Sequence, residues 1–126
     1  LEKLAKIKKL GIDPYPAKSN KKHTVATCLK SQGKQVQTAG RIMAIRGHGG
    51  SSFMDLVDQS AKIQVFFSES QLSNVSWQLL ALLDLGDFIQ VEGKVAKTQA
   101  GETTIFASNL TLLTNRQDLY RQVGMG

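Results

Sequence analysis

The chain has 126 residues, with 16 lysines and arginines, 10 aspartates and glutamates, two histidines and a single cysteine. This length suits one domain that buries a core without metal or disulfide support, and the lone Cys28 excludes an internal disulfide and a cysteine-based zinc cluster. No apolar run approaches the roughly 20 residues of a membrane helix, and no signal-peptide core is evident. We therefore expect a basic cytoplasmic domain that contacts no membrane.

The positive charge is concentrated toward the N-terminus. Residues 1–48 carry 11 basic groups against two acidic ones, a net charge of +9, whereas residues 49–126 carry five basic and eight acidic groups, a net charge of −3. A basic front half on a near-neutral body is typical of proteins that bind a polyanion by neutralising its phosphates. A solvated lysine-rich helix without any partner explains the same charge equally well.

Residues 1–34 are predicted to form a basic helical extension. Apolar residues spaced three apart and separated by lysines predict a short amphipathic helix over residues 1–10: Leu4, Ile7 and Leu10. Gly11 ends this helix, and the prolines that follow prevent its continuation. A weaker apolar cluster at residues 25–29 predicts a second short helix, ended by Gly33.

Residues 35–114 are predicted to fold as a sheet. Alternating patterns predict strands at 35–46, 52–58, 61–67, 88–98 and 102–114, with a flexible loop at 47–51. The one strong helical pattern of this region covers residues 70–83. Three strands, a helix and two strands is the order of the OB-fold, an all-β five-stranded Greek-key barrel, and Gly40 and Gly93 inside strands suit its sharp bends. A split βαβ arrangement fits less well, and residues 115–126 form a tail.

Two residues on neighbouring strands stand out because alternation places them on the open face of the barrel. Met54 and Leu56 face the core, so Phe53 faces outward, where an aromatic ring can stack on an unpaired base. Gln64 shares that face, and its side-chain amide can donate to and accept from a base edge at once. The alternatives are a bulged register that buries Phe53 and an exposed glutamine without a role.

Arg41 and Arg46 are candidates for binding a phosphate or a base edge through a guanidinium. Arg41 falls on the outward-facing positions of the first strand, with Gln37 and Met43, whereas Arg46 falls out of that phase. For both arginines the alternative is an exposed side chain in a surface ion pair.

Other motifs in the chain give little support for an enzyme. The GHGG sequence at 47–50 lacks the remaining residues and the strand–loop–helix context of a phosphate-binding loop. His23 and Cys28 supply too few ligands for a metal, and nothing orients either histidine as a base for the cysteine. Trp77 is interpreted as a packing residue. We predict no catalytic residue, no metal and no cofactor in this chain.

The residues resemble those of a known family, the N-terminal anticodon-binding domain of class II lysyl-tRNA synthetases, over residues 1–114. The segments that carry the resemblance are KLAKIKKLGIDPYP (3–16), AGRIMAIRGHGGSSFMDLVD (39–58), IQVFF (63–67) and LDLGDFIQVEGKVAKTQAGE (83–102). The AGRI…F.D…IQVFF core is similar across lysyl, aspartyl and asparaginyl synthetases, whereas GIDPYP and RGHG resemble the lysyl branch.

The resemblance implies roles for particular residues. Phe53 is expected to stack on the central anticodon uridine, Gln64 to bind that base, Arg46 to hold the anticodon loop, and Glu102 to contact anticodon bases. Arg41 is expected nearby. The lysines of the first helix are expected to bind the tRNA backbone: Lys3, Lys6, Lys8 and Lys9.

The resemblance also implies what the chain lacks. The catalytic motifs of the synthetase are absent, so ATP and magnesium belong to the parent enzyme, a lysine–tRNA ligase that forms homodimers. The chain begins at Leu1 rather than methionine, and we expect it to be part of a longer protein. Two other functions stay open: a sequence-tolerant single-strand binder, which the few outward aromatics disfavour, and a dimerisation or protein-interaction module.

Overall fold

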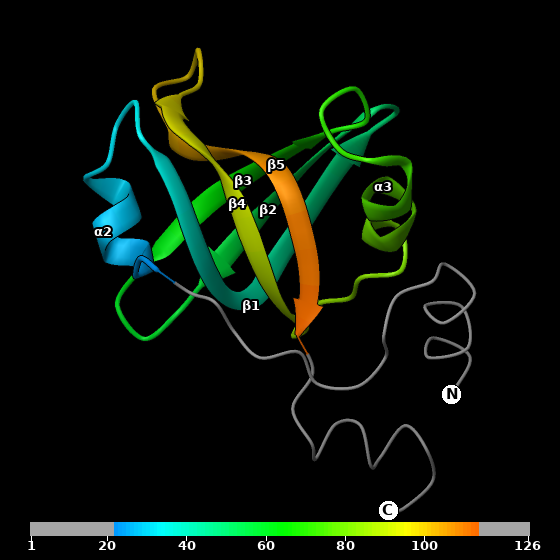
Figure 1. Cartoon of the computed structure of the whole chain (residues 1–126), viewed down its shortest axis with the longest axis horizontal. Helices are drawn as coiled ribbons and strands as arrows, with labels where there is room; N and C mark the ends of the chain where they lie inside the picture. The colour runs from blue at the N-terminus through cyan, green and yellow to red at the C-terminus, as the bar shows by residue number, and fades with distance from the viewer. Residues whose placement is uncertain (1–21, 114–126) are drawn as a thin grey trace, which may run out of the picture.

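The computed structural model of the chain describes residues 22–113 as a five-stranded closed barrel with two short helices (Figure 1). The elements in chain order are α2 (Val25–Leu29), β1 (Gln35–His48), β2 (Ser51–Val57), β3 (Lys62–Ser68), α3 (Asn74–Leu80), β4 (Phe88–Lys97) and β5 (Thr103–Leu113). The strands follow the order β1-β2-β3-β5-β4 around the barrel, and only β3 and β5 pair in parallel. The predicted OB-fold is confirmed, while the helix predicted over residues 1–10 lies outside the described residues.

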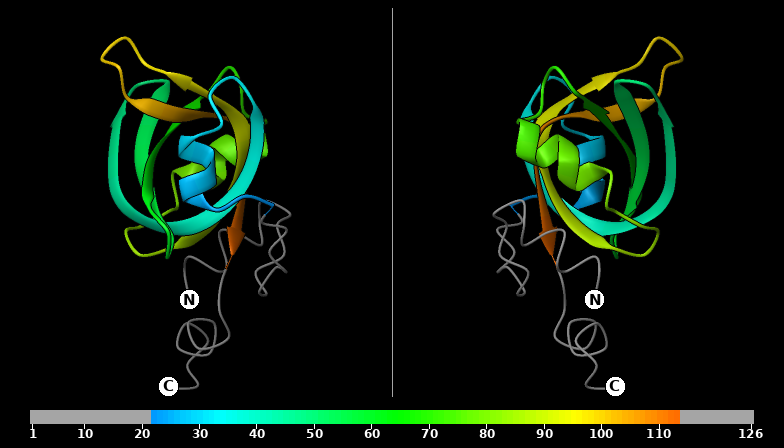
Figure 2. Two further views of the ribbon diagram at one scale, coloured as in Figure 1. Left: turned by 90° about the vertical axis from the view of Figure 1, so that its left-hand side faces the viewer. Right: turned by 90° about the vertical axis from the view of Figure 1, so that its right-hand side faces the viewer.

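The two helices lie at opposite ends of the barrel, as the end-on views in Figure 2 show. Thr24 caps α2, and this helix buries Val25 and Cys28. The backbone N–H of Val25 donates to Asp58 Oδ2 at 2.9 Å, which attaches the helix to the β2–β3 turn. At the other end, Ser73 caps α3, and Leu79 and Leu80 pack into the core. The helices therefore cover the ends of the core and leave the outer face of the strands open.

The pattern of burial along β2 and β3 alternates strictly. Met54, Leu56, Ile63, Val65 and Phe67 are at most 2% exposed, whereas the residues between them are half-buried or exposed. Because successive side chains of a strand point to opposite faces, this alternation separates a packed interior from a continuous outer face.

Two glycines allow strands to approach each other where the barrel bends. A Cβ atom on Gly40 would lie 2.6 Å from the carbonyl oxygen of Val57, and one on Gly93 would overlap the carbonyl oxygen of Phe106. The β4–β5 register shifts between Glu92 and Gly93, so Gly93 lies at a bulge. The prediction that these glycines serve the bends of a small barrel agrees with both contacts.

Two predicted element boundaries are wrong. The helix predicted over residues 70–83 covers only Asn74–Leu80, because Leu72 lies in a turn and the extended Ser73 begins the helix as its N-cap. The flexible loop predicted at 47–51 is a two-residue turn at Gly49 and Gly50, since β1 continues to His48 and pairs with the start of β2.

His23 has a structural place beside β1. Its backbone N–H donates to the carbonyl oxygen of Gln37 at 3.0 Å, and its Nδ1 accepts from the N–H of Gln37 at 3.1 Å. Between residues 22 and 113, no three histidine, cysteine or acidic side chains gather as a metal site requires. None of the helices in that range has the length and apolar character that crossing a membrane demands.

Candidate nucleic-acid interface

A groove of about 560 Å³ opens on the outer face of the barrel, between the strands β1–β3 and the β4–β5 loop. Four of the predicted site residues line it, together with three residues of the loop: Arg46, Phe53, Gln64 and Glu102, with Thr98, Gln99 and Ala100. The sequence interpretation did not single out these loop residues, because a turn of polar and small residues has no distinguishing pattern. The structure thus brings together residues that are far apart in the chain.

A β-bulge in β1 brings Arg46 to this groove. The register between β1 and β2 shifts between Ile42 and Ala44, so Met43 is the extra residue. Beyond the bulge, Arg46 lies directly opposite Phe53 and shares its outward face. The bulge explains why Arg46 falls out of phase with Arg41 in the sequence, since one extra residue reverses the alternation.

Hydrogen bonds join four polar side chains, of which Arg46 and Gln64 line the groove. The Arg46 guanidinium donates through one nitrogen to Asp55 Oδ1 and to Gln64 Oε1, both at 3.2 Å. Gln64 Nε2 donates to Thr104 Oγ1 at 3.0 Å. The chain of contacts crosses β1, β2, β3 and β5, so it orients the arginine and the glutamine together. Gln64 retains one amide hydrogen and one lone pair for a ligand.

Three outward-facing phenylalanines form a row across the neighbouring strands β2, β3 and β5. The ring centroids of Phe53 and Phe66 are 4.9 Å apart, and those of Phe66 and Phe106 are 5.6 Å apart. All three rings are half-buried, so each one packs against its neighbour and presents part of its surface to solvent. The outer face therefore carries more aromatic surface than expected, because the position of Phe106 follows from a long-range strand pairing.

Glu102 lines the groove from the end of the β4–β5 loop that leads into β5. Its backbone N–H donates to Thr98 Oγ1 at 3.2 Å, and its carbonyl oxygen accepts from the backbone N–H of Thr98 at 3.0 Å. Gly101 has a φ of 86°, a conformation that suits glycine, and completes the turn. The side chain of Glu102 is exposed and can accept a hydrogen bond from a bound base.

The structure does not bring Arg41 to this groove. Arg41 pairs with Val57 at the far end of β2, and its guanidinium lies 4.6 Å from the centroid of the Phe88 ring. It lines a separate groove of about 850 Å³ with Met43 and Asp58, among others. The lysines predicted to bind the RNA backbone lie outside the described residues: Lys3, Lys6, Lys8 and Lys9.

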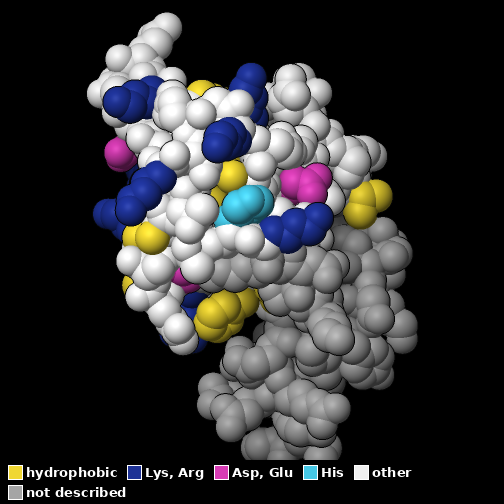
Figure 3. All heavy atoms as spheres, turned by 60° about the vertical axis from the view of Figure 1, so that its left-hand side comes forward, with side chains coloured by type: hydrophobic (Ala, Val, Ile, Leu, Met, Phe, Trp, Pro, Cys, Tyr) yellow, Lys and Arg dark blue, Asp and Glu magenta, His cyan; other side chains and the backbone are white. Residues whose placement is uncertain are grey.

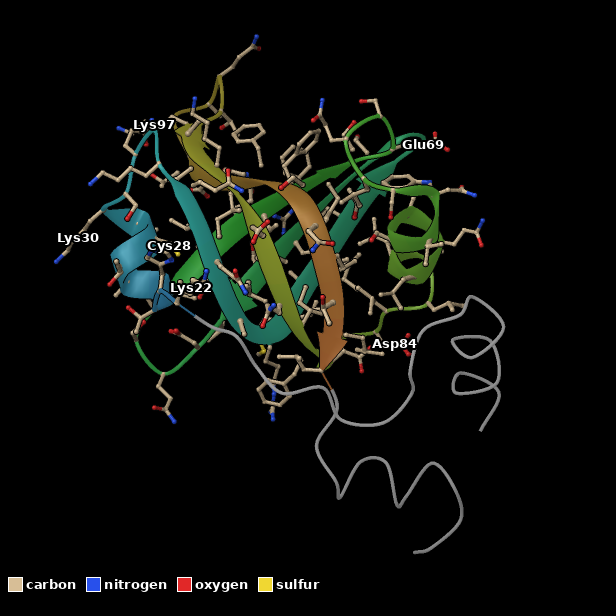
Figure 4. All side chains as sticks on the ribbon, in the orientation of Figure 1. Lys22, Cys28, Lys30, Glu69, Asp84 and Lys97 are labelled. Carbon is tan, nitrogen blue, oxygen red and sulfur yellow. The ribbon has the colours of Figure 1, made fainter. Side chains whose placement is uncertain are left out.

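Charge is distributed unevenly over the barrel. Lys22 and Lys30 flank α2 and Lys97 lies at the end of β4 beside the β4–β5 loop, whereas Glu69 and Asp84 lie toward the α3 end (Figure 4). On the face that Figure 3 presents, basic side chains outnumber acidic ones. A polyanion would therefore be attracted to the α2 end of the barrel and to the adjoining base of the β4–β5 loop, rather than to the α3 end.

The barrel and its outer groove define an OB-fold nucleic-acid-binding domain, and the chain belongs to that family: the family model tRNA_anti-codon, described as an OB-fold nucleic acid binding domain, matches residues 36–113. Among curated proteins, the chain is similar to a protein named lysine–tRNA ligase from Carboxydothermus hydrogenoformans, with 43% identity over 117 residues. Proteins of the same name from Dehalococcoides mccartyi and Syntrophomonas wolfei are 43% and 36% identical. These matches cover 90% of this chain and about a quarter of each relative.

Proposed function

We propose that this chain is the anticodon-recognition domain of a lysine–tRNA ligase and that its ligand is the anticodon loop of a lysine tRNA. The groove on the outer face carries this proposal, because it joins an aromatic platform, an oriented amide and a guanidinium. Family membership and the similarity to lysine–tRNA ligases support it. The chain spans about a quarter of those relatives, so aminoacylation, with its ATP and magnesium, belongs to the remainder of such an enzyme.

Recognition requires the anticodon bases to leave their stack and lie across the sheet. The central base stacks on Phe53, and Gln64 contacts its edge through the amide groups that Arg46 and Thr104 leave available. Arg46 contacts the loop through the donors not used by Asp55 and Gln64, and Glu102 accepts from a neighbouring base. In this arrangement aromatic stacking supplies affinity, while the polar groups supply the choice of base.

The RNA backbone is attracted by charge outside the groove. Lys97 lies next to the β4–β5 loop, and the lysines of residues 1–22 add positive charge to the same chain. These contacts orient the RNA without reading its sequence. Arg41 contributes to binding only if the RNA extends along β2 to the separate groove. The parent ligase is proposed to be a cytoplasmic homodimer.

A binding comparison tests the proposal. The affinity of the full chain for a lysine tRNA anticodon stem-loop is measured beside that for a stem-loop whose central uridine is replaced by cytidine. We expect tighter binding to the uridine form and a loss of affinity with Phe53→Ala, by about 1–3 kcal/mol for one stacked base. Equal affinity for the two stem-loops, or full affinity of the variant, contradicts base reading.

A second candidate function is sequence-tolerant binding of single strands, and the row of three phenylalanines favours it. Successive aromatic rings can stack on successive bases of any identity. This function predicts similar affinity for unrelated single-stranded RNAs of equal length. The anticodon proposal instead predicts that the stem-loop binds more tightly, since it presents the bases already splayed. Sedimentation with and without RNA separates both from a module that only dimerises.

A further inference from the structure

Thr104 breaks the alternation of β5. It is fully buried, although it occupies the outward-facing position beside Gln64 in the parallel pair of β3 and β5. Its Oγ1 donates to the carbonyl oxygen of Glu102 at 3.0 Å and accepts from Gln64 Nε2 at 3.0 Å. A hydroxyl has one proton, and the carbonyl oxygen can only accept. Toward Gln64, therefore, Thr104 presents a lone pair and no donor.

The partner on the other side of Gln64 has the opposite chemistry. Arg46 donates to Gln64 Oε1 at 3.2 Å, and a guanidinium carries donors alone. Reversing the amide of Gln64 would place its NH₂ group against the guanidinium donors and its oxygen against a hydroxyl whose proton is already used. Both hydrogen bonds would be lost, so the chemistry of the two neighbours fixes which end of the amide faces β1 and which faces β5.

A fixed amide distinguishes bases that a rotating amide accepts equally. Uracil presents a donor, N3–H, between two carbonyl acceptors, whereas cytosine presents an amino donor beside the acceptor N3. A glutamine whose amide can flip, so that its oxygen and nitrogen change places, can match the edge of either base. A glutamine held in one orientation matches only one order of donor and acceptor. The direction of the amide is therefore the property that chooses between the two pyrimidines.

We infer that Thr104 is a positioning residue that determines pyrimidine specificity in the groove, by holding Gln64 in a single amide orientation. This inference rests on the proposed function, because it concerns the base that Gln64 reads. Thr104 is buried and would not contact the RNA itself, yet it would influence which base the domain prefers.

The experiment removes the hydroxyl of Thr104 while its shape is kept. Thr104→Val is compared with Thr104→Ser, which restores the hydroxyl, and with Thr38→Val. Thr38 is the matched control because it is also fully buried in the barrel and its Oγ1 has no hydrogen-bond partner. The full chain binds stem-loops with uridine or cytidine at the central anticodon position, and the ratio of the two affinities is measured by fluorescence anisotropy.

We expect Thr104→Val to reduce the uridine-to-cytidine ratio about three- to tenfold, the usual effect of one hydrogen bond, with a smaller change in affinity for the uridine form. Thr104→Ser and Thr38→Val retain the ratio of the unmodified chain. In the absence of RNA, the Gln64 NH₂ proton that donates to Thr104 should exchange slowly with solvent in the unmodified chain. In Thr104→Val that proton should exchange faster, and its resonance should move toward that of an exposed glutamine. That spectral change reports the amide itself rather than stability.

The outcomes separate the two proposals. If the unmodified chain prefers uridine and Phe53→Ala weakens binding, but Thr104→Val retains both the ratio and the NH₂ signals, the role of Thr104 is wrong and the proposed function stands. If the unmodified chain binds both stem-loops equally, the proposed function fails first. Should Thr104→Val not fold, Thr104→Ala must show the same loss of preference, and an unchanged ratio there also overturns the inference.

Discussion

Arg46 lies directly opposite Phe53 on the outer face of the barrel. Regular alternation counted from the start of β1 would instead place Arg46 on the inner face. The bulge at Met43 makes this possible, because it adds one residue to β1 between Arg41 and Arg46. Asp55 then holds one nitrogen of the guanidinium at 3.2 Å, while the Arg46 side chain stays 49% exposed. A cation, an aromatic platform and an amide thus occupy one small area without a loop to carry them.

Asp55→Asn is expected to free Arg46 for a phosphate. Arg46 is 49% exposed and Asp55 22%, so the ion pair contributes little to stability, about 1 kcal/mol or less. Without the carboxylate, nonspecific RNA binding should strengthen, and the plot of log affinity against log salt should steepen by about 0.7 for one added phosphate contact. Salt titrations measure this. Glu69→Gln, which removes the same charge near the α3 end, should leave the slope nearly unchanged.

Gln64→Glu is expected to reverse the choice of pyrimidine. A carboxylate keeps the acceptor that faces Arg46 but loses the amide donor to Thr104, and an acceptor suits the amino group of cytosine. Preference should shift toward cytidine by about 1–3 kcal/mol, while affinity for both stem-loops falls because a negative charge enters the groove. Competition between the two RNAs measures the shift. A retained preference for uridine would show that Gln64 does not read the base.

Gly93→Ala is expected to destabilise the barrel and weaken RNA binding together. The added Cβ would overlap the carbonyl oxygen of Phe106, whose ring ends the aromatic row. Backbone atoms of two paired strands must move, at a cost of about 1–3 kcal/mol in the free energy of unfolding. Urea denaturation measures the loss. Gly50→Ala is the control, since its Cβ would lie 3.6 Å from Glu69 Oε1, an ordinary contact.

Asp58→Ala is expected to detach α2 from the end of the barrel. The Asp58 carboxylate accepts from the backbone N–H groups of Val25 at 2.9 Å, Ser60 at 2.7 Å and Ala61 at 3.1 Å. Hydrogen bonds to a charged group contribute about 1.5–3 kcal/mol each, so the loss should exceed that of one bond. Hydrogen exchange should show fast exchange in Val25–Leu29 and slow exchange in β3. Equal protection of both segments would contradict the attachment.

The sequence predicted the strands and the outward positions of Phe53 and Gln64, because alternation alone decides the face of a short, regular strand. Arg46 was expected at the same site from the resemblance, but alternation alone did not place it on that face, since a bulge at Met43 has no marker in the residues themselves. Neither Phe106 nor Thr104 could be placed, because both depend on the parallel pairing of β3 with β5 across 40 residues of chain. Local alternation predicts where the strands lie and which face each side chain takes. Long-range strand pairing decides which of these side chains contact one another.

The parallel contact between β3 and β5 has a consequence for the order of folding. Phe53 and Arg46 meet in a hairpin of adjacent strands. We expect this hairpin to form early, because its contacts are local. Thr104 reaches Gln64 only when the last strand of the barrel docks, a step with a high entropic cost of loop closure. Under the proposed roles of these residues, a chain that has formed β1 to β3 would stack a base before it could tell one pyrimidine from another, and selectivity for the RNA would report that the final strand is in place.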